Sequence, residues 1–93
     1  MMEKYQRTDA FDEEEFEDDL VVMNTRTQAV VALNGTARVV WEALAEGATH
    51  DDLVALFVEA FPDTDPKALE RDVADILARL EKAELVAVAG DDG

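Results

Sequence analysis

The feature that most constrains this fold is an apolar stripe near the C-terminal end of the sequence. Asp65 can cap a helix there, and Pro66 stands at its first position, where the N–H that proline lacks would be unbonded anyway. Apolar residues then recur at intervals of four, three, four and three positions: Leu69, Val73, Ile76, Leu80 and Ala83. This spacing predicts an amphipathic helix with one apolar face. Because that face must be buried and the chain has 93 residues, the other segments are expected to share one core with it.

Two shorter helices are expected ahead of this one. Asn34 can cap the first by accepting hydrogen bonds from free backbone N–H groups, and Gly47 ends it. Its apolar stripe consists of Val40, Trp41 and Leu44. Thr49 and Asp52 have a capping-box-like spacing at the start of the second helix, which ends at Pro62. The apolar face of that second helix consists of Leu53, Leu56, Phe57 and Ala60.

Short apolar runs predict a small number of strands. Residues 20–23 and 29–33 are two strand-length runs joined by a short polar segment, which is typical of an antiparallel hairpin. The joining segment has neither Asn-Gly nor Asp-Gly, so the turn type stays open. A terminal strand is expected at 85–88, and a first short strand within 3–11. The fold class is therefore α+β and winged helix-turn-helix-like, with two to three antiparallel strands followed by three helices.

The first 19 residues differ from the rest. Positions 12–19 hold seven carboxylates in eight residues, interrupted by Phe16, and a like-charge run of this kind is usually solvated and mobile. We therefore expect an acidic N-terminal segment at 1–19, a folded body at 20–88 and a flexible tail at 89–93.

The charge of the chain excludes several kinds of partner. Twenty-three acidic and eight basic residues give a formal net charge of −15, which repels nucleic-acid phosphates and anionic lipid headgroups and favours a basic or neutral partner. A winged helix-turn-helix that reads DNA presents basic residues on its third helix, but here acidic residues outnumber them. No apolar run reaches the roughly 18–20 residues of a membrane span. The N-terminus lacks an apolar signal-peptide core and the chain lacks cysteine, which together indicate a cytoplasmic protein.

The residue types argue against catalysis. The sequence has no serine and no cysteine, so the Ser-His-Asp and Cys-His arrangements of nucleophilic catalysis are excluded. The single histidine, His50, stands beside an expected helix start and is interpreted as a solvated residue. The acidic run at 12–19 lacks the alternating ligands and central glycine of an EF-hand loop, and the four glycines form no phosphate-binding loop. We expect no catalytic residue, no metal site and no cofactor.

One predicted strand carries a positive signal for binding. In an up-down meander, the last strand before the helices lies at a sheet edge, where unpaired N–H and C=O groups attract another strand. Residues 29–33 have no charge, proline or glycine to protect such an edge. The functional interpretation is β-augmentation, in which a peptide adds a strand at this edge. The alternative is that a helix or the strand at 85–88 covers it.

A series of short motifs spans residues 20–88. They are Val22-Met23-Asn24-Thr25-Arg26-Thr27, Leu33-Asn34-Gly35-Thr36-Ala37, Val40-Trp41-Glu42-Ala43-Leu44, Glu46-Gly47-Ala48-Thr49 with Leu53, and Asp72-Val73 in a helix leading through Leu80 to Leu85-Val86. With these motifs the chain resembles the PQQ-biosynthesis protein D family, the peptide-recognition elements of ribosomally made, modified peptides. The Asn-Thr-Arg-Thr hairpin resembles the stand-alone recognition proteins of lasso-peptide clusters. Two residues depart from the family pattern, because Gln28 and Glu84 stand where it usually has glycine.

The resemblance implies that the chain binds the leader of a precursor peptide as an extra strand, between the third strand and the third helix. The domain would then hand the core peptide to a maturation enzyme such as a leader protease, a cyclase or a radical enzyme. The expected contact residues are Ala29, Val30, Val31, Leu33, Asp72, Val73, Asp75, Ile76 and Arg79. For Leu33, Val73 and Ile76 the competing interpretation is core packing, and the three charged residues are also compatible with ordinary solvated helix positions. The alternative function is an acidic protein–protein adaptor or a regulatory winged-helix domain without a peptide cleft.

Overall fold

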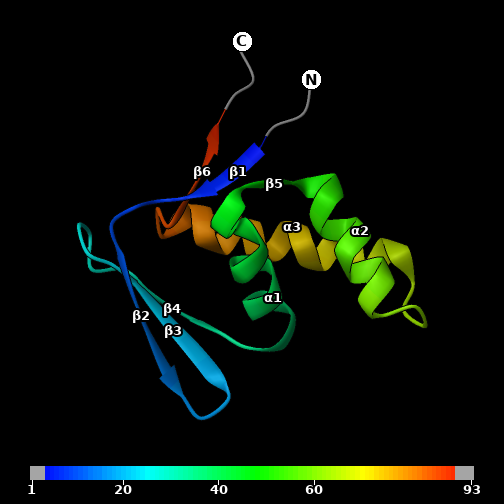
Figure 1. The fold of residues 1–93 in the computed structure, drawn as a ribbon, viewed down its shortest axis with the longest axis horizontal. Helices are drawn as coiled ribbons and strands as arrows, with labels where there is room; N and C mark the ends of the chain where they lie inside the picture. The colour runs from blue at the N-terminus through cyan, green and yellow to red at the C-terminus, as the bar shows by residue number, and fades with distance from the viewer. Residues whose placement is uncertain (1–3, 90–93) are drawn as a thin grey trace.

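The computed structural model describes residues 4–89, which form an α+β fold of six strands and three α-helices (Figure 1). In chain order the elements are β1 (Lys4–Arg7), β2 (Phe11–Phe16), β3 (Asp19–Asn24), β4 (Val30–Leu33), α1 (Gly35–Ala43), the 3-10 turn η1 (Leu44–Glu46), β5 (Ala48–Thr49), α2 (His50–Ala60), α3 (Pro66–Lys82) and β6 (Val86–Ala89). The α+β class is confirmed, although two or three strands were expected. Of the tail expected at 89–93, Ala89 belongs to β6 and the rest lies outside the described residues.

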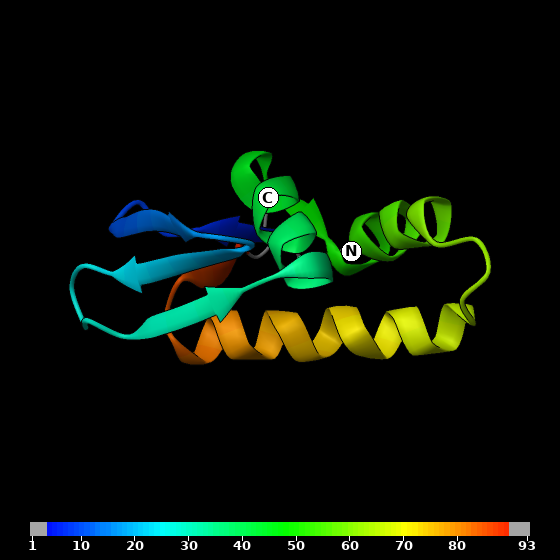
Figure 2. The ribbon, with the colours of Figure 1, turned by 90° about the horizontal axis from the view of Figure 1, so that it is seen from below.

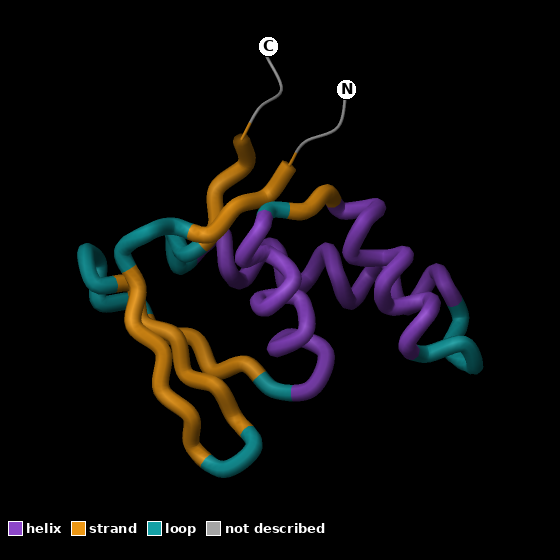
Figure 3. The backbone as a smooth tube through the Cα atoms, in the orientation of Figure 1, coloured by secondary structure: helices purple, strands orange, loops and turns teal. Residues whose placement is uncertain are grey.

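The predicted hairpin is present and forms part of a three-stranded antiparallel sheet in the order β2-β3-β4. Leu20 lies opposite Leu33, and Met23 lies opposite Val30. β4 pairs with β3 along one side and is therefore an edge of this sheet. Figure 3 shows the sheet beside the helices, with the edge strand leading directly into α1.

A second small sheet joins distant parts of the chain in the order β5-β1-β6. Lys4 of β1 pairs with Thr49 of β5 on one side and with Ala89 of β6 on the other. The first strand expected within residues 3–11 is β1, and the terminal strand expected at 85–88 is β6, displaced by one residue. Because β6 pairs with β1, it does not cover the edge of β4.

The acidic run at 12–19 does not behave as the sequence suggests. Residues up to Phe16 form β2, which pairs with β3 over its whole length, from Phe11 opposite Asn24 to Phe16 opposite Asp19. Beyond the half-buried Phe11, the side chains of this strand are exposed. The ladder with β3 satisfies the backbone groups on one side of β2, and its acidic side chains stay at the surface, so a strand forms despite their charge.

One core holds the helices and both sheets together, with Trp41 and Phe57 as its largest fully buried side chains. The stripe predicted for α3 is buried along its length, and Leu77 joins it. In α2, Leu53 and Phe57 are buried as predicted, but Leu56 and Ala60 are exposed. The prediction for these two residues is wrong because α2 packs mainly against α3. This single contact buries only a narrow line of residues on the surface of α2.

The helix starts follow the predicted caps in two of three cases. The N–H of Asp52 donates to Thr49 Oγ1 at 3.0 Å and the N–H of Thr49 donates to Asp52 Oδ2 at 3.1 Å, which completes a capping box. Asp65 accepts from the N–H of Lys67 at 3.0 Å. Asn34 occupies the N-cap of α1, but its side chain makes no capping hydrogen bond, because Gly35 follows it with a left-handed φ of 51° rather than helical geometry.

Three turns hold a residue other than glycine in the left-handed region, and the first of these residues is Glu17, between β2 and β3, with φ of 55°. Gln28, in the β3–β4 turn, has φ of 67°, and Glu84, between α3 and β6, has φ of 58°. Both are the positions where the family pattern noted above usually has glycine. The left-handed backbone geometry is therefore kept at both positions, although glutamine and glutamate adopt it less readily than glycine.

Candidate functional site

The backbone groups of β4 point in two directions. The N–H of Asn24 donates to the C=O of Ala29 at 2.8 Å, which makes these two residues a hydrogen-bonded pair. Such pairs alternate with non-bonded pairs along an antiparallel ladder, so in this register Val31 and Leu33 also bond toward β3. The N–H and C=O groups of Val30 and Ala32 therefore point toward the open edge.

A groove of about 450 Å³ runs along this edge, between β4 and the C-terminal end of α3. Its lining consists of Ala29, Val30, Val31, Ala32, Arg79, Lys82 and Ala83. Figure 2 shows β4 and the last turns of α3 side by side and running in opposite directions. The strand wall offers apolar side chains and free backbone groups, and the helix wall offers two cations. An extended peptide has the dimensions and the hydrogen-bonding groups to occupy such a groove.

Asn24 connects the two walls of the groove. Its buried side-chain amide donates to the C=O of Ala83 at 3.2 Å and to the C=O of Glu84 at 2.8 Å. Its Oδ1 accepts from the N–H groups of Arg26 and Thr27 at 2.8 and 3.1 Å. One side chain therefore fastens the β3–β4 turn to the end of α3, which fixes how far apart the strand and the helix lie.

The residues predicted to contact a ligand divide into three groups in the structure. Ala29, Val30, Val31 and Arg79 line the groove, and Val30 is 59% exposed. Leu33, Val73 and Ile76 are buried in the core, as their competing interpretation held. Asp72 and Asp75 are exposed on α3, outside the lining of the groove.

Three lining residues were not among the predicted contacts: Ala32, Lys82 and Ala83. The helical spacing contained a signal for two of them, because Lys82 and Ala83 stand three and four positions after Arg79 and so share its side of the helix. Ala32 could be recognised only with the register of β4 in hand, since its importance lies in its backbone groups.

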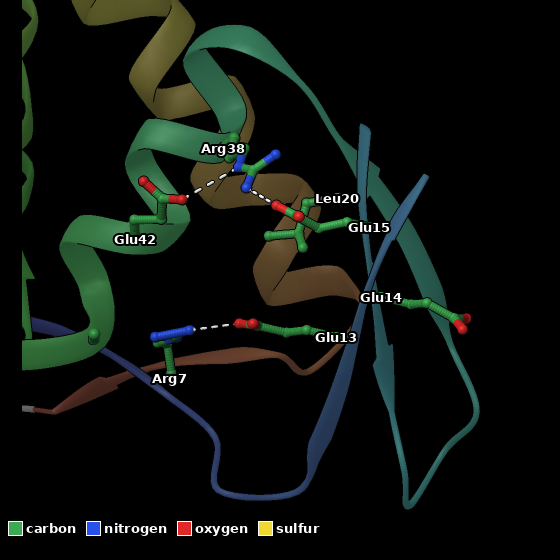
Figure 4. A pocket seen from close by; sticks show the side chains of 8 residues that line it. Arg7, Glu13, Glu14, Glu15, Leu20, Arg38 and Glu42 are labelled. Atoms are coloured by element: carbon green, nitrogen blue, oxygen red, sulfur yellow. Dashed lines mark hydrogen bonds and ion pairs between the residues drawn. The ribbon is translucent and has the colours of Figure 1, made fainter. Parts of the chain in front are cut away.

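A second cavity, of about 380 Å³, lies between β2 and α1 and is lined by charged side chains (Figure 4). Its cations already have partners within the protein. Arg38 pairs with Glu42 at 3.2 Å and with Glu15, and Arg7 pairs with Glu13 at 2.8 Å. The Arg38 contact fastens β2 to α1 and the Arg7 contact fastens it to β1, which gives the acidic strand a structural role.

Glu13 is the centre of that attachment. Hydrogen bonds from Arg7 and from the indole N–H of Trp41 lower the pKa of the Glu13 carboxyl. The guanidinium of Arg7 lies 4.1 Å from the centre of the Trp41 ring, and Phe11 packs edge-on against the same ring at 5.0 Å. The carboxylate of an exposed strand is thus bound to the largest side chain of the core.

Residues 4–89 were also searched for a metal site and for a membrane-spanning helix. In this part of the chain, no group of three or more His, Asp or Glu side chains is arranged to hold a metal ion. None of its helices combines the length and apolar character needed to cross a membrane.

The sequence itself places the chain in a family. Residues 19–86 match the family model described as coenzyme PQQ synthesis protein D (PqqD). The chain belongs to the PqqD family. The matched segment begins with β3 and ends at the first residue of β6, so it contains β4, α3 and the groove between them. No curated protein matches this PqqD-family sequence.

Two solved structures share the fold of this PqqD-family chain. TbiB1 in complex with the TbiA(beta) leader peptide is similar with a TM-score of 0.77 and 24% sequence identity, over 92% of this chain and 99% of that one. Lasso peptide synthetase B1 complexed with the leader peptide is similar with a TM-score of 0.72 and 18% identity, over 89% of this chain and 96% of that one. The share of this chain that is covered is larger than residues 19–86, so the shared fold extends beyond the segment that the family model matches.

Proposed function

We propose that this protein is a non-catalytic recognition element that binds the leader of a ribosomally made precursor peptide. The leader adds a strand to β4, and the domain presents the precursor to a maturation enzyme such as a leader protease, a cyclase or a radical enzyme. The observation that carries the proposal is the open edge of β4, where Val30 and Ala32 direct backbone groups into a groove. The similarity to two leader-peptide complexes, one of them of a lasso peptide synthetase, supports a lasso-peptide precursor as the ligand.

Strand addition accounts for both affinity and selectivity at this edge. Two outward residues offer two N–H donors and two C=O acceptors, and each hydrogen bond contributes about 0.5–1.5 kcal/mol net. Apolar contacts with the groove walls add to this. We expect a dissociation constant near micromolar or tighter, about −8 kcal/mol.

Covalent chemistry is assigned to the partner enzyme. The sequence has no serine or cysteine to act as a nucleophile. We expect purified protein, incubated with the full precursor peptide, to return it with unchanged mass. A cleaved or modified product in mass spectrometry would contradict the non-catalytic role.

Isothermal titration calorimetry with a synthetic leader tests the binding. The ligand is the leader of the precursor peptide encoded beside the gene for this protein, and the control is the same peptide with its sequence scrambled. Heat from the leader and none from the scrambled peptide supports the proposal. Absence of heat with folded protein would refute it and favour the adaptor function.

A further inference from the structure

The groove has the opposite charge to the molecule around it. The chain carries 23 acidic and eight basic residues, yet the two charged side chains that line the groove are both cations, Arg79 and Lys82. Three other arginines of the described chain pair with carboxylates: Arg7, Arg26 and Arg38. Within residues 4–89, neither Arg79 nor Lys82 forms such an ion pair; Lys4, Lys67 and Arg71 form none either, but they do not line the groove. The groove thus gathers two unpaired positive charges at one place.

The contact made by Arg79 shows what a bound strand would change. Its Nη2 donates to the C=O of Ala32 at 3.3 Å, and that carbonyl is one of the two acceptors that β4 directs toward the open edge. An added strand needs the same carbonyl for its own N–H. Arg79 must then give up or share its acceptor, and a guanidinium in a groove is best satisfied by a carboxylate, which forms shorter and stronger hydrogen bonds than a neutral carbonyl.

The spacing of the two cations suits a strand. Arg79 and Lys82 are separated by three residues of helix, a rise of about 4.5 Å. Side chains two residues apart on one face of a strand are separated by about 6.6 Å, so both cations can reach neighbouring same-face side chains. The side of an added strand that faces α3 is therefore the side that the cations contact.

We infer that this groove selects a leader with an acidic residue in its strand-forming segment, and that Arg79 and Lys82 are the residues that determine this specificity. The inference rests on the proposed function, since it names the chemistry of the peptide that the groove takes. It also separates two electrostatic effects. The net charge of −15 favours a basic partner at a distance, whereas the groove favours a carboxylate on contact.

A double-mutant cycle tests the inference. The probe is a fluorescein-labelled synthetic peptide with the leader sequence of the precursor encoded beside this gene, and the readout is its dissociation constant by fluorescence anisotropy. The protein variants are Arg79→Gln and Lys82→Gln, and circular dichroism checks that each is folded. Arg71→Gln and Lys67→Gln are the matched controls, because these residues lie exposed on the same helix outside the groove. In the peptide, each Asp and Glu is replaced in turn by Asn or Gln.

The expected result is a loss of about two- to fivefold in affinity for each groove variant, in the range of an exposed ion pair, and no change for the controls. One peptide substitution should cause the same loss with wild-type protein and almost none with Arg79→Gln. Groove variants that bind as tightly as wild type, additive losses, or a bound leader without Asp or Glu in its strand-forming segment would each overturn the inference and leave leader binding intact. A wild-type protein that binds no leader would instead overturn the proposed function and this inference with it.

Discussion

A pair of proline substitutions on β4 separates the folding role of this strand from its binding role. Val30 directs its N–H to the open edge, while Val31 directs its N–H to β3, as the Asn24–Ala29 hydrogen bond and the register require. Proline removes the N–H and places a ring where a partner backbone would lie. Val30→Pro should therefore disturb the ligand, and Val31→Pro should disturb the sheet.

The two proline variants should differ in both stability and affinity for the leader. Val31→Pro breaks a ladder hydrogen bond between β4 and β3 and should lower the free energy of unfolding by about 3 kcal/mol or more. Val30→Pro loses an exposed side chain and no bond within the domain, so its stability should change by less than about 1 kcal/mol. Its affinity for the leader should fall by about 1–3 kcal/mol, because a carbonyl of the ligand is left unpaired at the interface.

Urea denaturation followed by Trp41 fluorescence gives the stability, and calorimetry with the leader gives the affinity. Val30→Ala is the matched control, since it shortens the same side chain and keeps the N–H. Val30→Ala should keep most of the binding free energy of about 1–3 kcal/mol that Val30→Pro is expected to lose. A folded Val30→Pro protein that keeps full leader affinity would show that strand addition to β4 is wrong.

Four further substitutions test other parts of the structure. Gln28→Gly and Glu84→Gly should each raise the free energy of unfolding by about 0.5–1 kcal/mol, because glycine relieves the left-handed backbone; lower stability in denaturation would contradict this. Asn24→Ala should lower the free energy of unfolding by about 2–3 kcal/mol, because the carbonyls of Ala83 and Glu84 lose their donor. A loss below about 0.5 kcal/mol, as for ordinary surface substitutions, would show that the amide does not hold the groove together. Glu13→Gln should lower the free energy of unfolding by about 1 kcal/mol at pH 7. Because the pKa of Glu13 is lowered in the folded state, its contribution is complete above the unfolded value of about 4.3 and is lost as the pH falls through the folded value. The stabilities of the two proteins in urea denaturation should therefore converge as the pH falls, and a constant difference would refute this.

The sequence predicts the segments whose signals are local. The capping box of α2, the Asp65-Pro66 start of α3 and the stripe below it depend on residues a few positions apart, and the structure has all three. The strand β2 could not be predicted in this way. Its acidic residues have low strand propensity. They are held by the ladder with β3 and by contacts with cations of other elements, Glu13 with Arg7 of β1 and Glu15 with Arg38 of α1.

The candidate site was predictable to a similar extent. The absence of charge on residues 29–33 indicated an open edge, and β4 has that edge. Helical periodicity shows which residues of α3 share a side of the helix, but not which of them lie next to the edge of β4. That depends on the position of α3 along the strand, which the Asn24 amide and the turn at Glu84 fix. Asp72 and Asp75 share the stripe of Arg79 but lie beyond the groove for this reason.

The pairing of β1 with β6 brings the two ends of the fold together. Lys4 lies directly opposite Ala89 in an antiparallel ladder, so their Cα atoms are about 5 Å apart. In Figure 1 these strand ends lie at the top, whereas β4 runs through the lower half of the molecule. A host protein could therefore receive the whole unit in one surface loop, entering and leaving at a single point. Grafted in this way into an unrelated enzyme, the domain would keep the edge of β4 free and could deliver a tagged peptide to a new active site.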